Sequence, residues 1–255
     1  MRKPILLLLL PLLVSCSYED MLQKLLPKEE SAFAQSYLEN VRAKRFDEVR
    51  KRLSTELLTP DVDSKLSEVA GYFPDGDLIE VKPIGSNVFT TPDTWRASLT
   101  YQYRFTNGWA VANVVLDREK EGLVVKGINV TRLQQSLEEF NAFTLKDKTA
   151  LHYLFLSLVV IVPTFILYTL VLCIRTPMSK RKWPWIVFIL FGVAGFHLDW
   201  TSGQTATHLL SAHLFGAAAT AASPYAPWIL TLSVPLGAIV FLVRRRSLAQ
   251  QRTAT

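Results

Sequence analysis

The chain has 255 residues, of which 49% are hydrophobic and 20% are charged, and its formal net charge is +6. Residues 150–255 hold eight bases and one acid, whereas residues 1–149 hold 20 bases and 21 acids. The excess of bases therefore belongs to an apolar half, where it stands at the ends of apolar runs. This pattern is typical of membrane topology and argues against a nucleic-acid-binding face. Two cysteines are too few for a disulfide framework.

The first 15 residues have the anatomy of a signal peptide. A basic start and an apolar core precede Ser15 and Cys16, and the core is too short to span a membrane. Leu13-Val14-Ser15-Cys16 resembles the lipobox of bacterial lipoproteins, which implies cleavage before Cys16 and a lipid on its sulfur. The alternative is an ordinary signal peptide, or an uncleaved anchor, that contains a cysteine. Residues 16–30 are predicted to form a tether.

Residues 31–133 are predicted to form a soluble domain that begins with three helices. Apolar residues recur at helical spacing after three helix-starting signals, which are Ser31, Asp47 and the Thr59-Pro60 pair. The helical part ends at Pro74-Asp75-Gly76, a sequence that favours a turn.

The hydrophobic period then changes to two. Apolar and polar residues alternate from Trp95 to Phe105, which predicts a strand with one buried face. Asn107-Gly108 predicts a tight hairpin turn, and a two-residue loop at this pair would place Tyr103 opposite Ala112. Further strands are expected around residues 111–115, at 123–130 and, at the sheet edge, at 78–84.

Three helices followed by an antiparallel meander define an α+β fold. Residues 31–133 resemble the NTF2-like (cystatin-like) domains of many bacterial lipoproteins. The resemblance rests on Tyr37-Leu38-Glu39-Asn40 through Phe46-Asp47, on the Trp109 hairpin, and on the closing run from Val124 to Val130. It implies a cone-like arrangement, in which helices lie across the concave face of a curved sheet and can enclose a pocket.

The predicted inward face of the sheet carries an aromatic stripe. Its members are Trp95, Tyr101, Tyr103 and Phe105. Such a stripe either packs against the helices as core or lines an apolar ligand pocket with tyrosine hydroxyls as polar groups. The family resemblance implies that enzymes of this kind use a histidine–aspartate pair or an aspartate base, and the domain contains no histidine. We therefore expect no catalytic residue, no cofactor and no metal site.

Residues 134–149 are predicted to form a juxtamembrane linker helix, and residues 150–246 an all-α transmembrane region. Its three expected spans are residues 151–174, 183–200 and 228–243. The apolar residues 207–222 are expected to form a re-entrant or interfacial helix. Basic residues after the first and third spans predict that these ends, and the tail at 247–255, lie in the cytoplasm.

All four histidines belong to the apolar half. They are His152, His197, His208 and His213, with Asp199 close to them in sequence. A metal or proton site is one interpretation, and separate interfacial side chains are the other. On a helix, residues five apart point in different directions, so the spacing of His208 and His213 favours the second.

Together these features predict a lipoprotein of the bacterial inner membrane. Its soluble domain would face the periplasm and bind a protein or ligand at the membrane surface, without catalysis. The alternatives are an enzyme with its active site in the cone, and an accessory subunit of a membrane transport or assembly complex. The expected partners are the lipid bilayer and a membrane or periplasmic protein, but not nucleic acid.

The lipidation of Cys16 can be tested directly. Replacing Cys16 with Ala should abolish metabolic acyl labelling of the protein and the accompanying mobility shift, because the thioether needs the sulfur. Cys173→Ala is the matched control and should label as the wild type does. Unchanged labelling of Cys16→Ala would contradict the lipobox.

Overall fold

The computed structural model of the protein describes residues 18–92, 94–120, 122–178 and 181–250. The predicted signal peptide and the lipidation site at Cys16 lie outside these described residues. The chain divides into two compact units, Met1–Leu137 and Glu138–Thr255. Each unit is described by itself.

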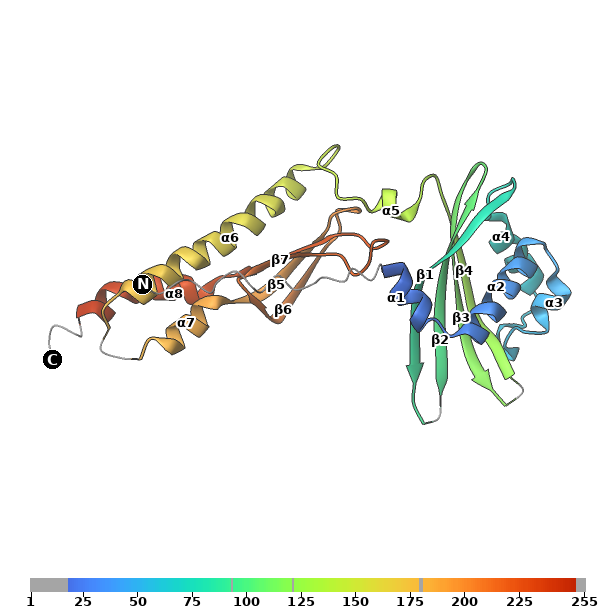
Figure 1. Ribbon diagram of the computed structural model, residues 1–255, viewed down its shortest axis with the longest axis horizontal. Coiled ribbons are helices and arrows are strands. Elements are labelled where there is room, and N and C mark those ends of the chain that lie inside the picture. Colours follow the sequence, from blue (N-terminus) through green and yellow to red (C-terminus); the bar gives the residue numbers. More distant parts are fainter. Residues whose placement is uncertain (1–17, 93, 121, 179–180, 251–255) are drawn as a thin grey trace, which may run out of the picture. The chain divides into compact units, whose positions relative to one another are not determined.

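The first unit combines a group of helices with one antiparallel sheet. Its helices are α1 (Tyr18–Leu25), α2 (Lys28–Arg42), α3 (Phe46–Arg50), the short 3-10 helix η1 (Thr55–Leu57) and α4 (Val62–Gly71). Its strands are β1 (Leu78–Thr90), β2 (Trp95–Phe105), β3 (Gly108–Glu119) and β4 (Gly122–Leu133). They pair in the order β1-β2-β3-β4. Figure 1 shows α2, α3 and α4 on one side of this sheet and α1 on the other.

Apolar and polar residues alternate along β2, and this alternation explains why α2 and α4 pack on one face of the sheet. Its apolar positions all join the core, where they meet α2 and α4 through residues such as Leu38 and Leu66. Leu38 and Leu99 are fully buried. Burying one such side chain contributes about 1.5–3 kcal/mol. The face that β2 offers therefore decides where the helices lie.

The hairpin between β2 and β3 differs from the predicted one by two residues. Phe105 pairs with Gly108, so Thr106 and Asn107 form the loop, and Tyr103 lies opposite Ala110 rather than Ala112. The φ angle of Gly108 is +156°, which a glycine adopts freely. Because the shift is even, the apolar residues still share one face.

Two segments of the first unit contain more structure than expected. The edge strand β1 continues to Thr90, past a register shift between Pro83 and Gly85. The predicted tether forms α1, which packs against β1. Leu22 of α1 and Ile84 of β1 are both buried, and the Tyr18 hydroxyl donates to the Ile84 carbonyl at 3.5 Å.

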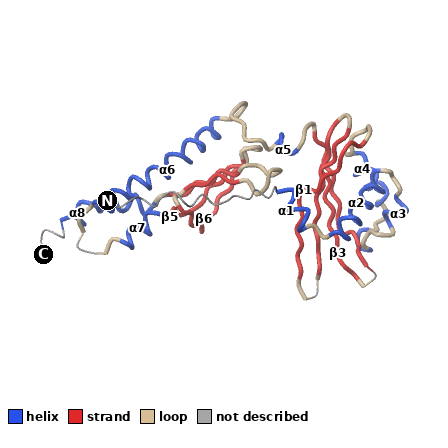
Figure 2. Tube along the Cα trace, viewed as in Figure 1, coloured by secondary structure: helices blue, strands red, loops and turns tan. Residues whose placement is uncertain are grey.

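The second unit contains helices and a second antiparallel sheet. Its helices are α5 (Leu137–Phe140) at the boundary, α6 (Ala150–Arg175), α7 (Trp183–Leu190) and α8 (Leu236–Gln250). Its strands are β5 (Phe191–Asp199), β6 (Thr205–Leu214), β7 (Ala217–Thr220) and β8 (Ile229–Val234), which pair in the order β6-β5-β8-β7. Figure 2 shows these strands between the helical stretches. In place of the predicted linker helix over 134–149, the structure has the four-residue α5.

The predicted all-α transmembrane region with three spans is wrong. Among the described residues, α6 alone is long and apolar enough to cross a membrane. The expected span 183–200 is divided between α7 and β5, and α7 has eight residues, or about 12 Å, against a bilayer core of about 30 Å. Gly192 and Gly195 lie just beyond this division, and glycine disfavours a helix.

The other two segments expected as membrane helices also contain strands. The expected span 228–243 is divided between β8 and α8 at Pro235, which has no backbone N–H and favours an extended residue before it. The expected re-entrant or interfacial helix over 207–222 forms most of β6 and all of β7. The high average hydrophobicity of these segments therefore predicted membrane helices, whereas the segments contain short strands, some of which pack against α6.

Packing against α6 organises the second unit. Ile166 and Cys173 of α6 are buried with residues of α7 and α8. Nearer the start of α6, Phe155, Leu156 and Val159 pack against a cluster of Leu198, Trp200 and Leu230.

The hydrogen bond that joins α2 to β2 gives a test of the first unit. Tyr101 is fully buried, and its hydroxyl lies 3.0 Å from the Ser31 hydroxyl. Tyr101→Phe should lower the free energy of unfolding by about 1 kcal/mol, because a buried partner loses its bond. Tyr72→Phe, at a side chain 43% exposed, is the control and should be close to neutral. Urea unfolding measures both; equal effects would contradict the role of the bond.

Candidate functional site

The predicted aromatic stripe lies in the core of the first unit. Tyr101, Tyr103 and Phe105 are buried, and the rings of Tyr103 and Phe105 meet Phe73 edge-on at centroid distances of 5.4 Å and 6.3 Å. Both tyrosines and Phe105 belong to the hydrophobic core, together with Leu38 of α2 and Leu66 of α4. The stripe therefore packs against the helices.

The Tyr101 hydroxyl of the stripe is hydrogen-bonded to Ser31. The Tyr101 hydroxyl lies 3.3 Å from the Ser31 carbonyl, to which it can donate. Burial raises the pKa of Tyr101, although its hydrogen bond to Ser31 acts in the opposite direction. Burial also raises the pKa of Tyr103. Both hydroxyls are therefore protonated at neutral pH and are poor proton acceptors.

Trp95 lies at the margin of this core and is half-buried. The Arg118 guanidinium lies over its ring, 4.8 Å from the centroid, and pairs with the buried carboxylate of Glu30 at the start of α2. A charged pair that is partly desolvated in this way holds α2 to the end of the sheet. Trp95 is part of that contact.

A groove between the helices and the last strand of the first unit's sheet is the best candidate site. It has a volume of about 250 Å³ and lies between η1, α4 and β4. Its apolar lining residues are Leu53, Leu57, Val62, Leu66 and Ile128, and Glu56, Thr59, Lys65 and Gly127 complete it. The apolar side chains make it suited to an apolar group.

Backbone pairing with β4 positions one wall of the groove. The Ser54 N–H donates to the Val125 carbonyl at 2.9 Å, and the Val125 N–H donates to the Arg52 carbonyl at 2.8 Å. These bonds make Leu53 and Val125 a short parallel bridge. The chain after α3 is thereby fixed to β4, and η1 is held opposite α4.

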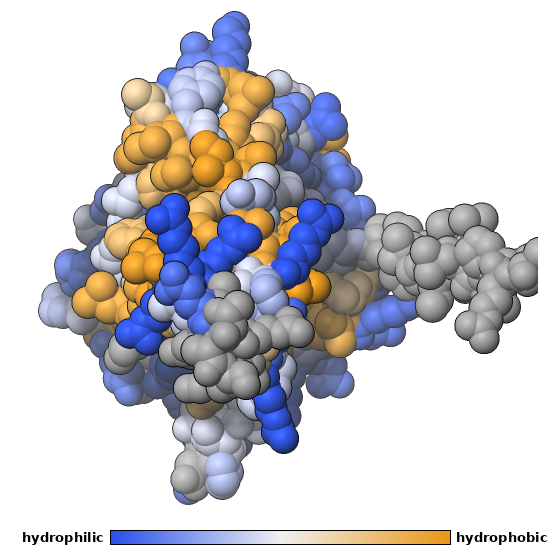
Figure 3. All heavy atoms as spheres, turned by 90° about the vertical axis from the view of Figure 1, so that its left-hand side faces the viewer, coloured by the Kyte–Doolittle hydropathy of each residue, from blue (hydrophilic) through white to orange (hydrophobic). Residues whose placement is uncertain are grey.

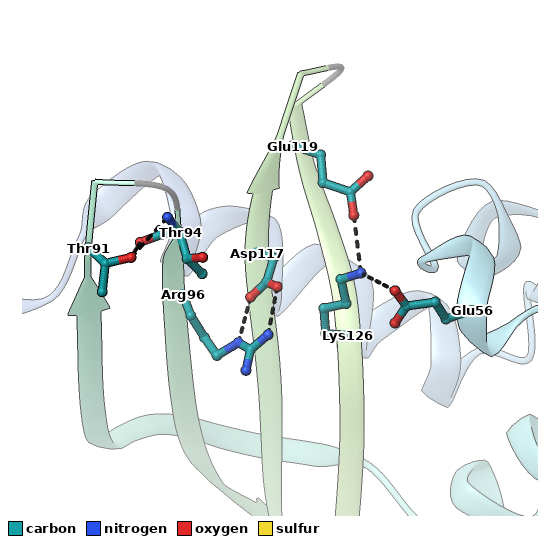
Figure 4. A network of polar contacts seen from close by, with 7 residues as sticks. All are labelled: Glu56, Thr91, Thr94, Arg96, Asp117, Glu119 and Lys126. Atoms are coloured by element: carbon teal, nitrogen blue, oxygen red, sulfur yellow. Dashed lines mark hydrogen bonds and ion pairs between the residues drawn. The ribbon is translucent and has the colours of Figure 1, made fainter.

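Charged pairs border the groove and continue along the sheet (Figure 4). Glu56, which lines the groove, lies 3.4 Å from Lys126, and Lys126 lies 3.2 Å from Glu119. Nearby, Arg96 donates to both carboxylate oxygens of Asp117, at 2.7 Å and 2.8 Å. These hydrogen bonds hold the pKa of the Asp117 carboxyl below its usual range, against an opposing effect of burial.

The structure brings three of the four histidines together. The His197 ring centroid lies 4.8 Å from that of His208 and 5.9 Å from that of His213. His152 instead meets the Trp200 ring edge-on at 5.2 Å. The expectation that His208 and His213 point apart assumes a helix and is wrong in that premise. Both belong to β6, which pairs with β5, the strand that carries His197.

The histidine group does not form a ready metal site. Among the described residues, no three histidine, cysteine or carboxylate side chains are arranged to hold a metal ion. The Asp199 carboxylate accepts hydrogen bonds from the Thr201 and Ser202 backbone N–H groups at 2.8 Å and 2.9 Å, so it fixes its own turn.

The sequence alone does not predict this groove. Helical spacing after Asp47 predicts one helix that carries Val49, Leu53 and Leu57, whereas α3 ends at Arg50 and a separate 3-10 helix follows. The groove depends on the pairing of this segment with β4, some 70 residues later in the chain. Local periodicity carries no signal for such a contact.

No protein-family model, curated protein or solved structure matches this chain. The resemblance to NTF2-like lipoprotein domains therefore stays a prediction from the sequence. Any function must be argued from the residues and their geometry.

The pairing of Arg96 with Asp117 predicts a pH dependence. A carboxyl whose pKa is lower in the folded than in the unfolded chain contributes stability above its unfolded pKa of about 3.9, and this contribution is lost as pH falls through the folded pKa. Asp117→Asn should therefore unfold at lower urea than the wild type at pH 7, and the difference should shrink as the pH approaches 2. Asp75→Asn, at an exposed carboxyl, should show no such trend. A difference that does not vary with pH would contradict the pairing.

Proposed function

We propose that this protein is a membrane-anchored binding protein whose first unit captures a protein partner at the periplasmic surface of the bacterial inner membrane. The anchor is α6, together with a lipid on Cys16. The binding site is the groove between η1, α4 and β4. The observation that carries the proposal is this open apolar groove on a domain whose aromatic stripe is packed as core.

The properties of α6 support the anchor. The helix has 26 residues and no charged side chain before its final Arg175. In its most apolar stretch of 18 residues, 17% of the residues are buried. A core helix of a soluble domain would be mostly buried, and a signal sequence would stand near the N-terminus. An apolar helix with few buried residues is suited to lipid.

The size and exposure of the groove support a protein partner. Ligand pockets commonly measure about 300–1,000 Å³, and this groove, at about 250 Å³, is smaller. It can accept one or two apolar side chains of a partner, as anchor residues of protein interfaces do. Leu57 is 37% exposed at its edge, and the neighbouring Leu58 is 45% exposed outside it.

The alternative of an enzyme with its active site in the cone receives less support. The predicted pocket residues Tyr101, Tyr103 and Phe105 are buried among other side chains. The tyrosine hydroxyls have raised pKa values, and the first unit has no histidine to act as a general base.

The groove can be tested by photo-crosslinking of the full-length protein in intact cells. A photoreactive amino acid at position 57 should give a discrete protein adduct, because its side chain enters the partner interface. The same amino acid at position 58 is the matched control and should give little adduct. The readout is the mass of the crosslinked species after purification in detergent.

The outcomes separate the possible occupants. A protein adduct at position 57 but not at position 58 supports the proposal. Equal adducts at both positions, or none at either, contradict it. A small mass increase confined to position 57 would show that the groove binds an apolar ligand and would contradict a protein partner. Co-purification that needs the second unit and not the groove favours an accessory subunit of a membrane complex.

A further inference from the structure

A second site lies at the end of the second unit, where α6 finishes. A cavity of about 440 Å³ opens there, lined by Arg175, Thr176, Pro177, Leu242, Arg245 and Arg246. It therefore joins the last residue of α6 to the basic part of α8. Figure 3 looks at this end and shows hydrophilic side chains gathered beside apolar surface.

A hydrogen bond holds the two sides of this cavity together. The Arg245 Nε donates to the Thr176 hydroxyl at 3.1 Å, and that hydroxyl donates to the Leu172 carbonyl at 2.6 Å. Thr176 is buried. The contact places Arg245, which is 70 positions later in the chain, beside Arg175. Arg245 and Arg246 are neighbours in the sequence, and the fold adds Arg175 to them.

Three guanidinium groups line this cavity. Among the ion pairs of the described residues, none includes Arg175, Arg245 or Arg246. The one acid after residue 149 is Asp199, which is engaged in its own turn. The end of α6 supplies only about half a negative charge. The cavity is therefore positively charged and would attract an anion.

The surroundings of the cavity show what kind of anion fits. Helix α8 is apolar from Leu236 to Val243 and becomes basic at Arg244. Ile174 and Val243 are 54% and 79% exposed beside the arginines. Apolar surface followed by a basic cluster matches the boundary between hydrocarbon and headgroups, so the ligand should carry a phosphate on an apolar body.

We propose that Arg175, Arg245 and Arg246 bind the phosphate of an anionic phospholipid. The guanidinium groups would donate charge-assisted hydrogen bonds to the phosphate oxygens, a geometry for which arginine is better suited than lysine. Leu242 and the exposed side chains of α6 and α8 would contact the acyl chains. This inference rests on the membrane location in the proposed function.

The test uses the full-length protein in neutral detergent, titrated with short-chain phosphatidylglycerol and, separately, phosphatidylcholine. Lipid bound to the intact protein is measured by native mass spectrometry. The wild type should prefer phosphatidylglycerol by about tenfold, as expected for one charge-assisted contact. Equal binding of the two lipids overturns the proposal, and this comparison needs no variant.

Two double variants with the same loss of charge locate the site. Arg175→Gln/Arg245→Gln should lose the preference for phosphatidylglycerol, whereas Arg181→Gln/Arg244→Gln, outside the cavity, should keep it. Equal losses in both variants would reduce the effect to net charge and overturn the site. Inorganic phosphate is added as a competitor: displacement at millimolar concentration would make free phosphate the ligand and overturn the lipid assignment.

Membrane fractionation of the wild type separates this inference from the proposed function. Wild-type protein that is released from membranes by salt alone would overturn both. Protein that stays in the membrane but shows no preference among the lipids would overturn the lipid site alone.

Discussion

The first unit depends on one constraint, the two-residue period of β2. Its apolar side chains can reach the core only if every other residue faces α2 and α4, so the strand decides on which side of the sheet the helices lie. The Tyr101 hydroxyl then needs a partner in that interior and finds it at Ser31 of α2. The position of the helices and the packed aromatic stripe both follow from this burial.

Because the interior of the first unit is packed, a binding site in this unit has to open at its surface. The bridge between Leu53 and Val125 holds η1 opposite α4 and leaves an apolar groove that the core does not fill. The charged pairs of Glu56, Lys126 and Glu119 border that groove and make its edge polar. Such a combination of an apolar floor and a polar rim is common in protein interfaces.

The second unit is organised by an apolar helix and by the charges at its end. Helix α6 provides a surface on which α7, α8 and the strands pack, while much of its length stays exposed. Among the described residues, no ion pair includes Arg175, Arg245 or Arg246. The contact of Arg245 with Thr176 gathers them at one cavity, and this concentration of charge is what suggests a phosphate ligand.

The sequence by itself determined the features that depend on local periodicity. These are the strand from Trp95 to Phe105, whose bounds match β2, and the long apolar helix α6. Hydropathy could not distinguish a span from short apolar strands, because Pro235 and the glycines near β5 break helices without lowering the mean apolar character. The groove and the arginine cavity were decided by tertiary structure alone. Each joins residues about 70 positions apart, and only the folded chain brings such residues together.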